Sequence, residues 1–167
     1  LASPKVIDSK KKEIIINDIA IPVLNYHKVD EQKIALSISP QEFEEQIKYL
    51  AKEGYNTITP SEMMNALEYG TPLPEKPIMI TFDDGYLDNL ENAFAILEKY
   101  QAKATIYVVV DRHDRDWSTY KKAHHNSGEL AREPKLNDEQ VKLLSNSGLI
   151  EIGSHTMTHA NLAKLDD

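Results

Sequence analysis

The sequence has 167 residues, 41% of them hydrophobic, which suits one domain with enough apolar side chains for a core. Its 27 acidic and 19 basic residues give a net charge of −8, which argues against nucleic-acid binding because that depends on Lys and Arg contacts to phosphate. Cysteine is absent, so disulfides and thiolate metal sites are excluded, and any metal must be bound by histidine and carboxylate groups. No apolar run approaches the ~18 residues that a transmembrane segment needs.

The chain begins its regular structure with a predicted strand and a capped helix. Residues 21–26 are mostly apolar and predict the strand. Ser39 supplies an N-cap, Pro40 suits the first helical position, and Glu42 completes a capping box. Apolar residues at helical spacing then predict a helix that Gly54 ends.

The next segment repeats this pattern, with a short strand at residues 57–58 and a second helix. Thr59 and Glu62 give the same capping signal, and Gly70 ends the helix. The buried stripe of this helix is expected to consist of Met63, Met64 and Leu67.

The rest of the chain predicts three further strands, each close to a helical segment. The strands are expected at residues 78–82, 105–110 and 149–153. Apolar residues at helical spacing predict helices within residues 90–97 and 137–144. The strand at 105–110 is apolar and β-branched almost throughout, which is typical of a parallel strand buried on both faces. This alternation predicts an α/β fold with parallel strands.

Two polar motifs come directly after predicted strands. Residues 81–86 read Thr-Phe-Asp-Asp-Gly-Tyr, and residues 154–159 read Ser-His-Thr-Met-Thr-His. The carboxyl ends of the strands form the active face of parallel α/β barrels. We therefore expect the two motifs to share one site.

The second motif contains a histidine pair that could bind a metal ion. His155 and His159 are spaced so that both imidazoles can lie on one side of a helical turn. Zinc proteases use this spacing with a glutamate base after the first histidine, but Thr156 stands there and excludes that class. Such a pair also arises by chance in solvated segments. If this pair binds a catalytic metal, a third ligand and a base must come from elsewhere.

The first motif can supply both missing groups. Asp83 and Asp84 are adjacent carboxylates at a strand end, so one can bind a metal while the other faces a bound water. A metal with three protein ligands and an open position polarises a carbonyl and lowers the pKa of water. The competing interpretation is a solvated Asp-Asp-Gly turn, which fits poorly after a buried strand beside a second histidine motif.

The two motifs together resemble the NodB-like polysaccharide deacetylases of carbohydrate esterase family 4. Residues 81–85 match the first motif of that family and residues 155–159 its second. The resemblance implies a distorted (β/α) barrel with fewer units than a complete one, and hydrolysis of N-acetyl or O-acetyl groups on an acetylated polysaccharide. It also implies a catalytic base, Asp83. The metal ligands that it implies, for a divalent ion that is usually zinc, are Asp84, His155 and His159.

The resemblance covers the chain from residue 21 to its end. We therefore expect an N-terminal extension at residues 1–20 and a polysaccharide deacetylase domain at residues 21–167. The family carries a further Arg- and Pro-containing motif and more strands after the histidine motif, so the domain is expected to be truncated on its C-terminal side, as an incomplete barrel. Residues 1–12 lack the apolar stretch of a signal peptide. The resemblance implies a secreted or cell-surface protein whose signal sequence has been removed, in peripheral association with the cell envelope.

His27 is the candidate general acid, because amide hydrolysis needs a proton for the leaving amine. Residues 24–27, Leu-Asn-Tyr-His, resemble the circularly permuted branch of poly-N-acetylglucosamine deacetylases, in which an N-terminal strand ending in Tyr-His supplies this group. Lys28 departs from that branch, where an acidic residue often follows. The competing interpretation is a structural histidine hydrogen-bonded at the barrel rim.

Other functions stay open from the residues alone. An iron oxygenase uses two histidines and one carboxylate, although that class is built of β-strands throughout. A non-catalytic carbohydrate-binding remnant would keep the metal site without turnover. Poly-N-acetylglucosamine, peptidoglycan and chitin-like substrates cannot be separated, and no substrate-binding residue is assigned. The polar segment at residues 111–135 is expected to be a solvated loop that carries His113, His124 and His125. Trp117 and Tyr120 in the same segment could stack on sugar rings or serve as surface anchors, and neither role is assigned.

Overall fold

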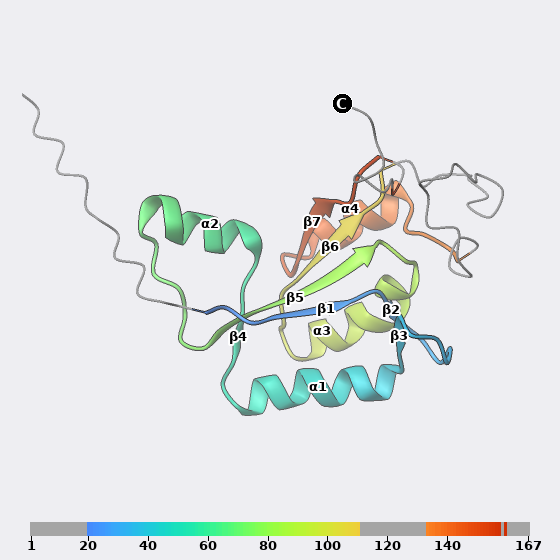
Figure 1. The fold of residues 1–167 in the computed structure, drawn as a ribbon, viewed down its shortest axis with the longest axis horizontal. Helices are drawn as coiled ribbons and strands as arrows, with labels where there is room; N and C mark the ends of the chain where they lie inside the picture. The colour runs from blue at the N-terminus through green and yellow to red at the C-terminus, as the bar shows by residue number, and fades with distance from the viewer. Residues whose placement is uncertain (1–19, 111–132, 158, 160–167) are drawn as a thin grey trace, which may run out of the picture.

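A parallel sheet lies at the centre of the part of the chain that the computed structural model describes, residues 20–110, 133–157 and 159 (Figure 1). Four of the five strands of the sheet lie in the order β1-β5-β6-β7, and the fifth, β4, pairs with the beginning of β5. All of these pairings are parallel, which confirms the predicted α/β class. The strands are β1 (Val23–Tyr26), β4 (Asn56–Thr57), β5 (Pro77–Asp84), β6 (Ala104–Val108) and β7 (Ile150–Ser154).

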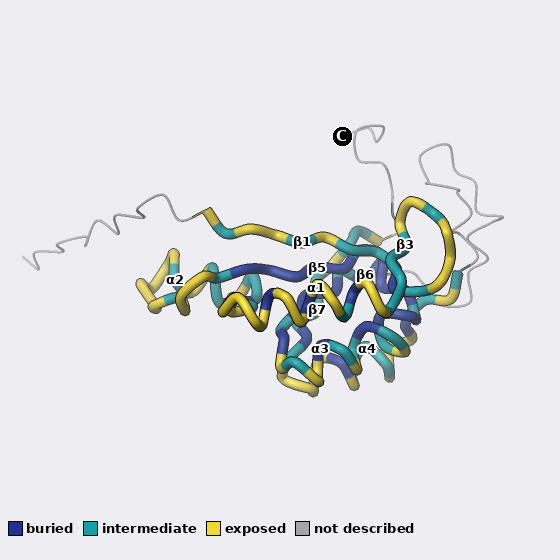
Figure 2. Tube along the Cα trace, turned by 90° about the horizontal axis from the view of Figure 1, so that it is seen from below, coloured by how far each residue is buried: buried dark blue, intermediate teal, exposed yellow. Residues whose placement is uncertain are grey.

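Helices cover one face of this sheet (Figures 1 and 2). They are α1 (Pro40–Lys52), α3 (Ala95–Lys99), which continues a π-helical segment η1 (Asn89–Phe94), and α4 (Asp138–Asn146). The helix α2 (Pro60–Tyr69) lies apart, near the beginning of the strands (Figure 1). The strands finish at the end of the sheet opposite α2, and the carboxyl ends of parallel strands are where sites form in such folds.

The core lies between the sheet and the helices that cover it. Side chains alternate along a strand, and the even-numbered residues of β5 and β6 belong to the buried cluster while the odd ones face away from it. Phe43 of α1 packs edge-on against Tyr26 and Phe82, with ring centroids 5.1 and 5.7 Å apart. Tyr26 and Phe82 themselves lie 5.5 Å apart, so aromatic contacts fix α1 against β1 and β5.

The predicted helix starts are confirmed. The Ser39 side chain accepts a hydrogen bond from the Glu42 backbone N–H, and the Glu42 carboxylate accepts one from the Ser39 backbone N–H. Thr59 with Glu62 forms the second capping box that the sequence predicted. Each box satisfies backbone N–H groups that the helix leaves without a partner.

The buried stripe predicted for α2 is wrong. None of its residues is buried, and Met64 and Leu67 are 44% and 39% exposed. The reason is the position of α2, which lies beside the beginning of the strands and not over the covered face of the sheet (Figure 1). Helical periodicity was present, but within the described chain no element packs closely against that face.

Two short strands and the π-helical turn were not predicted. The strands β2 (Lys28–Val29) and β3 (Ser37–Ile38) pair with each other in parallel just after β1. They are too short to show a period of two in the sequence. Their position matters because β2 directly follows His27, and the N–H of its Val29 donates a hydrogen bond to Asp88, shortly after β5.

The barrel is open, as predicted. In the described ranges, β1 and β7 each pair with a strand on one side only, and the sheet does not close on itself. Within the same ranges, no helix has the length and apolar character that crossing a membrane requires.

Candidate active site

The end of β5 directs two neighbouring carboxylates into different surroundings. Asp83 faces away from the helix-covered side, like the other odd-numbered residues of the strand. Asp84, the next residue, points to the other face and adopts a left-handed backbone with φ 71°, which is rare for a residue with a Cβ. Such a conformation costs about 1–3 kcal/mol and persists where the surroundings over-determine it, often at functional sites. The structure thus separates the directions of the two side chains, as the sequence predicted.

Gly85 allows the chain to turn at this point. Its φ is 65°, and a Cβ there would lie 2.9 Å from Cγ1 of Val108 on the neighbouring strand. Its carbonyl accepts a 2.9 Å hydrogen bond from the backbone N–H of Leu136. Only glycine combines a positive φ with this close approach to Val108 without strain.

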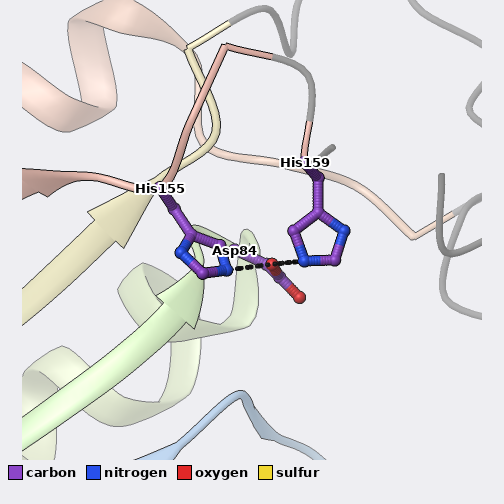
Figure 3. Close-up of side chains that lie close together, drawn as sticks. All are labelled: Asp84, His155 and His159. Carbon is purple, nitrogen blue, oxygen red and sulfur yellow. Dashed lines mark ion pairs between the residues drawn. The ribbon is translucent and has the colours of Figure 1, made fainter. Parts of the chain in front are cut away.

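Asp84 lies between the two histidines of the second motif (Figure 3). Its Oδ1 is 3.4 Å from Nε2 of His155 and 3.3 Å from Nε2 of His159. The Asp84 side chain is 8% exposed, whereas the two imidazoles are 32% and 27% exposed. The structure therefore brings together the three residues that the sequence singled out as metal ligands.

A turn, not a helix, brings the two histidines together. The backbone N–H of His155 donates a 2.8 Å hydrogen bond to the carbonyl of Val108 and so continues the pairing of β7 with β6. Thr156 and His159 then adopt positive φ angles of 63° and 53°. The helical turn expected from the spacing is wrong, although the outcome for the imidazoles is the same, with ring centroids 5.0 Å apart.

The donor atoms fit a small divalent ion. Asp84, His155 and His159 each offer one ligand atom, all within 4.8 Å of one another. Ligands that share a tetrahedral zinc at about 2.0–2.1 Å lie about 3.3 Å apart, close to the separations found here. Oδ1 of Asp84 is buried without a hydrogen-bond partner, a state that is costly for a carboxylate unless a cation lies beside it.

Tyr86 supports the ligand carboxylate, a role that sequence reasoning missed. Its side chain hydrogen-bonds Asp84, and its pKa is raised, first by burial and then by the negative charge of Asp84. Lys135 lies with its ammonium 3.2 Å from the centre of the Tyr86 ring. Burial lowers the pKa of Lys135 to about 8 against the opposing effect of Asp84. A tyrosine directly after the Asp-Asp-Gly turn was the available signal.

Asp83 lies beside the predicted general acid. Its Oδ2 is 3.9 Å from Nε2 of His27, and the two side chains are 22% and 24% exposed. The same Oδ2 accepts a 3.1 Å hydrogen bond from Nδ2 of Asn25. The structure thus places the predicted base and the predicted acid beside each other, at the strand end that also carries Asp84.

A buried ion cluster holds the backbone that follows His27. Asn89 donates a 2.9 Å hydrogen bond to the carbonyl of His27, and Asp88 accepts one of 2.9 Å from the N–H of Val29. Lys28, 2% exposed, places its ammonium 2.8 Å from Asp88. Lys28, which departs from the acidic residue expected here, therefore joins the end of β1 to the segment that follows the Asp-Asp-Gly turn.

Only the last residues of the predicted polar loop lie within the described chain, where Glu133 pairs with Lys28 and Lys135 lies over the Tyr86 ring. The histidines and aromatic residues of the loop, between residues 111 and 132, lie outside the described residues. The predicted extension at residues 1–20 also lies almost entirely outside them.

Comparisons with known proteins agree with this geometry. The family model for polysaccharide deacetylase matches residues 70–167, which include Asp83, Asp84 and both motif histidines. YxkH of Bacillus subtilis (strain 168), named for the same family, is 35% identical over 142 residues, 85% of this chain and 44% of its own length. The poly-beta-1,6-N-acetyl-D-glucosamine N-deacetylase of Escherichia coli (strain K12) is 29% identical over 80% of this chain and 20% of its own length.

A solved structure gives the same result in three dimensions. The polysaccharide deacetylase BC0361 from Bacillus cereus superposes with a TM-score of 0.68 and 31% sequence identity, over 88% of this chain and 42% of that one. The chain therefore spans less than half the length of each of these three proteins. A family match over more than half of the sequence, a relative at this identity and a shared fold lead to one conclusion: the chain belongs to the polysaccharide deacetylase family.

Proposed function

We propose that this protein hydrolyses N-acetyl groups from an amino-sugar polysaccharide with the help of one divalent metal ion, most simply Zn²⁺. The observation that carries the proposal is that His155 and His159 lie against the buried Oδ1 of Asp84. Asp83 precedes Asp84 at the end of β5. Three ligands of this kind are typical of catalytic zinc sites, which keep a fourth position open.

The chain's own residues supply the acid and base that amide hydrolysis requires. A bound zinc ion would polarise the acetyl carbonyl and lower the pKa of water. Asp83, in the role of general base, takes the proton of the attacking water as the new C–O bond forms. His27, 3.9 Å from Asp83, donates a proton to the amide nitrogen as the C–N bond breaks, which releases acetate and the free amine.

We further propose poly-β-1,6-N-acetyl-D-glucosamine as the preferred polymer. The E. coli relative is named for that substrate, and the end of β1 carries the Tyr-His sequence that resembles the same branch. Because such a polymer lies outside the cytoplasm, the proposal includes a secreted or cell-surface location at the cell envelope.

Acetate release from a panel of glycans tests the proposal. The full-length protein, loaded with zinc, is incubated with poly-β-1,6-N-acetyl-D-glucosamine, chitin oligomers and peptidoglycan. We expect acetate from the first substrate at the highest kcat/KM. The matched control is Asp83→Asn, which keeps a side chain of the same shape and is expected to lose about 10²–10⁴-fold in kcat while it retains zinc.

The outcomes separate the competing functions. Glycan binding without acetate release, in the wild type as in Asp83→Asn, would establish the carbohydrate-binding alternative. Turnover that requires iron and a 2-oxoacid would establish the oxygenase alternative. Higher kcat/KM on chitin or peptidoglycan would leave the reaction in place and replace the substrate.

A further inference from the structure

Asn25 is the residue of β1 that contacts the proposed base, and neither the motifs nor the family match assigns it a role. It pairs in register with Thr81 of β5, so that the two side chains lie on the same face of the sheet as Asp83. Nδ2 of Asn25 donates to Oδ2 of Asp83 at 3.1 Å. Oγ1 of Thr81 donates to Oδ1 of Asn25 at 3.0 Å.

The two hydrogen bonds fix the orientation of the amide. An ionised carboxylate only accepts hydrogen bonds, so the group that faces Asp83 must be the NH₂ of Asn25. The carbonyl oxygen of the amide then faces Thr81, whose hydroxyl can donate to it. Thr81 is 7% exposed and cannot easily exchange this partner for water. The amide is thus held at both ends.

The consequence concerns the two oxygens of Asp83. Oδ2 receives the hydrogen bond of Asn25 and lies 3.9 Å from His27, so it faces the end of β1. A general base must present an oxygen within about 2.6–3.2 Å of the water oxygen whose proton it removes. Because one lone pair of Oδ2 is already engaged, Oδ1 is the freer oxygen for the attacking water.

We propose that Asn25 is a positioning residue, which holds the Asp83 carboxylate in the rotamer that general-base catalysis requires, and that Thr81 acts through it. The inference rests on the proposed function, because it assigns Asp83 as the base. A misplacement of about 1 Å in a catalytic group can cost ~10²-fold in rate, so the loss of this hydrogen bond is expected to lower kcat strongly.

Kinetics of Asn25→Ala in the full-length, zinc-loaded protein test the proposal. We expect kcat for acetate release to fall about 10–100-fold, whereas KM, zinc content and Tm stay close to those of the wild type. Thr81→Val is expected to give a smaller loss, because Asn25 keeps its bond to Asp83 but loses its own support. Asn65→Ala, on the exposed side of α2, is the matched control and should change none of these values.

A double-mutant cycle distinguishes positioning from a general structural effect. If Asn25 acts through Asp83, the substitution Asn25→Ala should cost nothing further in an Asp83→Asn background. Full additivity of the two losses, or an unchanged kcat in Asn25→Ala alone, would overturn the proposal. A large fall in Tm in Asn25→Ala would also overturn it, and so would a rise in KM that accounts for the whole loss of kcat/KM.

Crystal structures keep the inference separate from the proposed function. In Asn25→Ala the Asp83 carboxylate is expected to rotate or to occupy two conformers, while in the wild type it keeps its bond to Asn25. An unchanged Asp83 rotamer in the variant overturns the positioning role whatever the activity. A wild-type protein that releases no acetate overturns the proposed function alone, and the pair of structures still decides the role of Asn25.

Discussion

At the scale of single residues, the site depends on two carboxylates that are adjacent in sequence and separated in function. Asp84 is buried and lies against two imidazoles, whereas Asp83 is partly exposed and lies against Asn25 and His27. Alternation along β5 points the two side chains to opposite faces, and the left-handed backbone of Asp84 begins the turn that Gly85 continues.

The metal site can be tested without activity. Replacement of both His155 and His159 by Ala is expected to abolish zinc binding, because a single carboxylate remains of the three ligands. Elemental analysis and titration should give about one zinc per chain in the wild type and none in the double variant. His124→Ala with His125→Ala is the matched control and should keep the metal. Unchanged zinc content in the first variant would contradict the assignment.

His27 can be assigned as proton donor or as structural residue by one substitution. His27→Ala is expected to retain zinc and to lower kcat by about 10²-fold or more, because the leaving amine loses its proton donor. Its backbone carbonyl keeps the hydrogen bond from Asn89, so Tm should change little. Near-normal kcat with a lowered Tm would instead establish a histidine that only stabilises the rim.

At the scale of elements, the ion cluster around Lys28 joins β2 to the beginning of η1. The Lys28 ammonium lies 2.8 to 3.0 Å from carboxylate oxygens of Asp30, Asp88 and Glu133, and its side chain is 3% exposed. A buried charge of this kind is costly unless it is paired, so its loss leaves carboxylates without compensation. The position of His27, at the end of β1, therefore depends on the stability of this cluster.

Stability against pH tests this cluster. Burial alone would raise the pKa of Asp30, but hydrogen bonds from Lys28 and others lower it overall, and a hydrogen bond from Lys28 lowers the pKa of Glu133. Carboxylates with a lowered pKa stabilise the fold above their unfolded pKa values of 3.8 and 4.5 and lose that contribution as the pH falls below them. Tm of the wild type should therefore drop as the pH is lowered towards 3.

The matched substitutions are Lys28→Met and Lys33→Met, the second at an exposed position of the same segment. Lys28→Met is expected to lower the free energy of unfolding by about 3 kcal/mol at pH 7 and to flatten the acid slope, because the cation that lowers both pKa values is gone. Lys33→Met should leave both unchanged. Equal acid slopes in all three proteins would contradict the proposed origin of the pH dependence.

The contact between β6 and β7 depends on a glycine. A Cβ at Gly153 would lie 2.4 Å from Cδ1 of Tyr107, a rigid ring that must move to make room. Gly153→Ala is therefore expected to lower the free energy of unfolding by about 1–3 kcal/mol, the usual cost of overpacking. Urea denaturation measures the effect, and Tyr107→Ala in the same chain should remove most of the extra cost. A strictly additive double variant would show that the ring is not the obstacle.

At the scale of the whole molecule, the sheet has two edges within the described residues, β1 and β7. Val23 on β1 is 53% exposed, and strand edges with free backbone groups favour pairing with other chains.

The polypeptide of residues 1–167, produced by itself, is expected to self-associate at micromolar concentration through these edges. Size-exclusion chromatography with light scattering measures the mass, and Val23→Lys should shift the protein towards the monomer because a charged edge strand resists pairing. A monodisperse monomer of the unsubstituted polypeptide would show that the edges are protected.

The sequence by itself determined the longer strands, the capped helices and the motifs, because these depend on local chemistry. Caps such as Ser39 with Glu42 act over three residues, and the apolar runs that predict β5 and β6 are continuous in the chain. The carboxylates and histidines could be placed at one face because parallel strands end at the same edge of a sheet.

Only the tertiary structure decided which groups support that site and which helix faces are covered. The hydrogen bond from Asn25 to Asp83 joins residues 58 positions apart, and the pairing of Lys28 with Asp88 joins residues 60 apart. No local pattern encodes such contacts, since they depend on strand register. The exposure of α2 was equally undetermined, because periodicity gives a helix an apolar face but does not say whether another element packs against it.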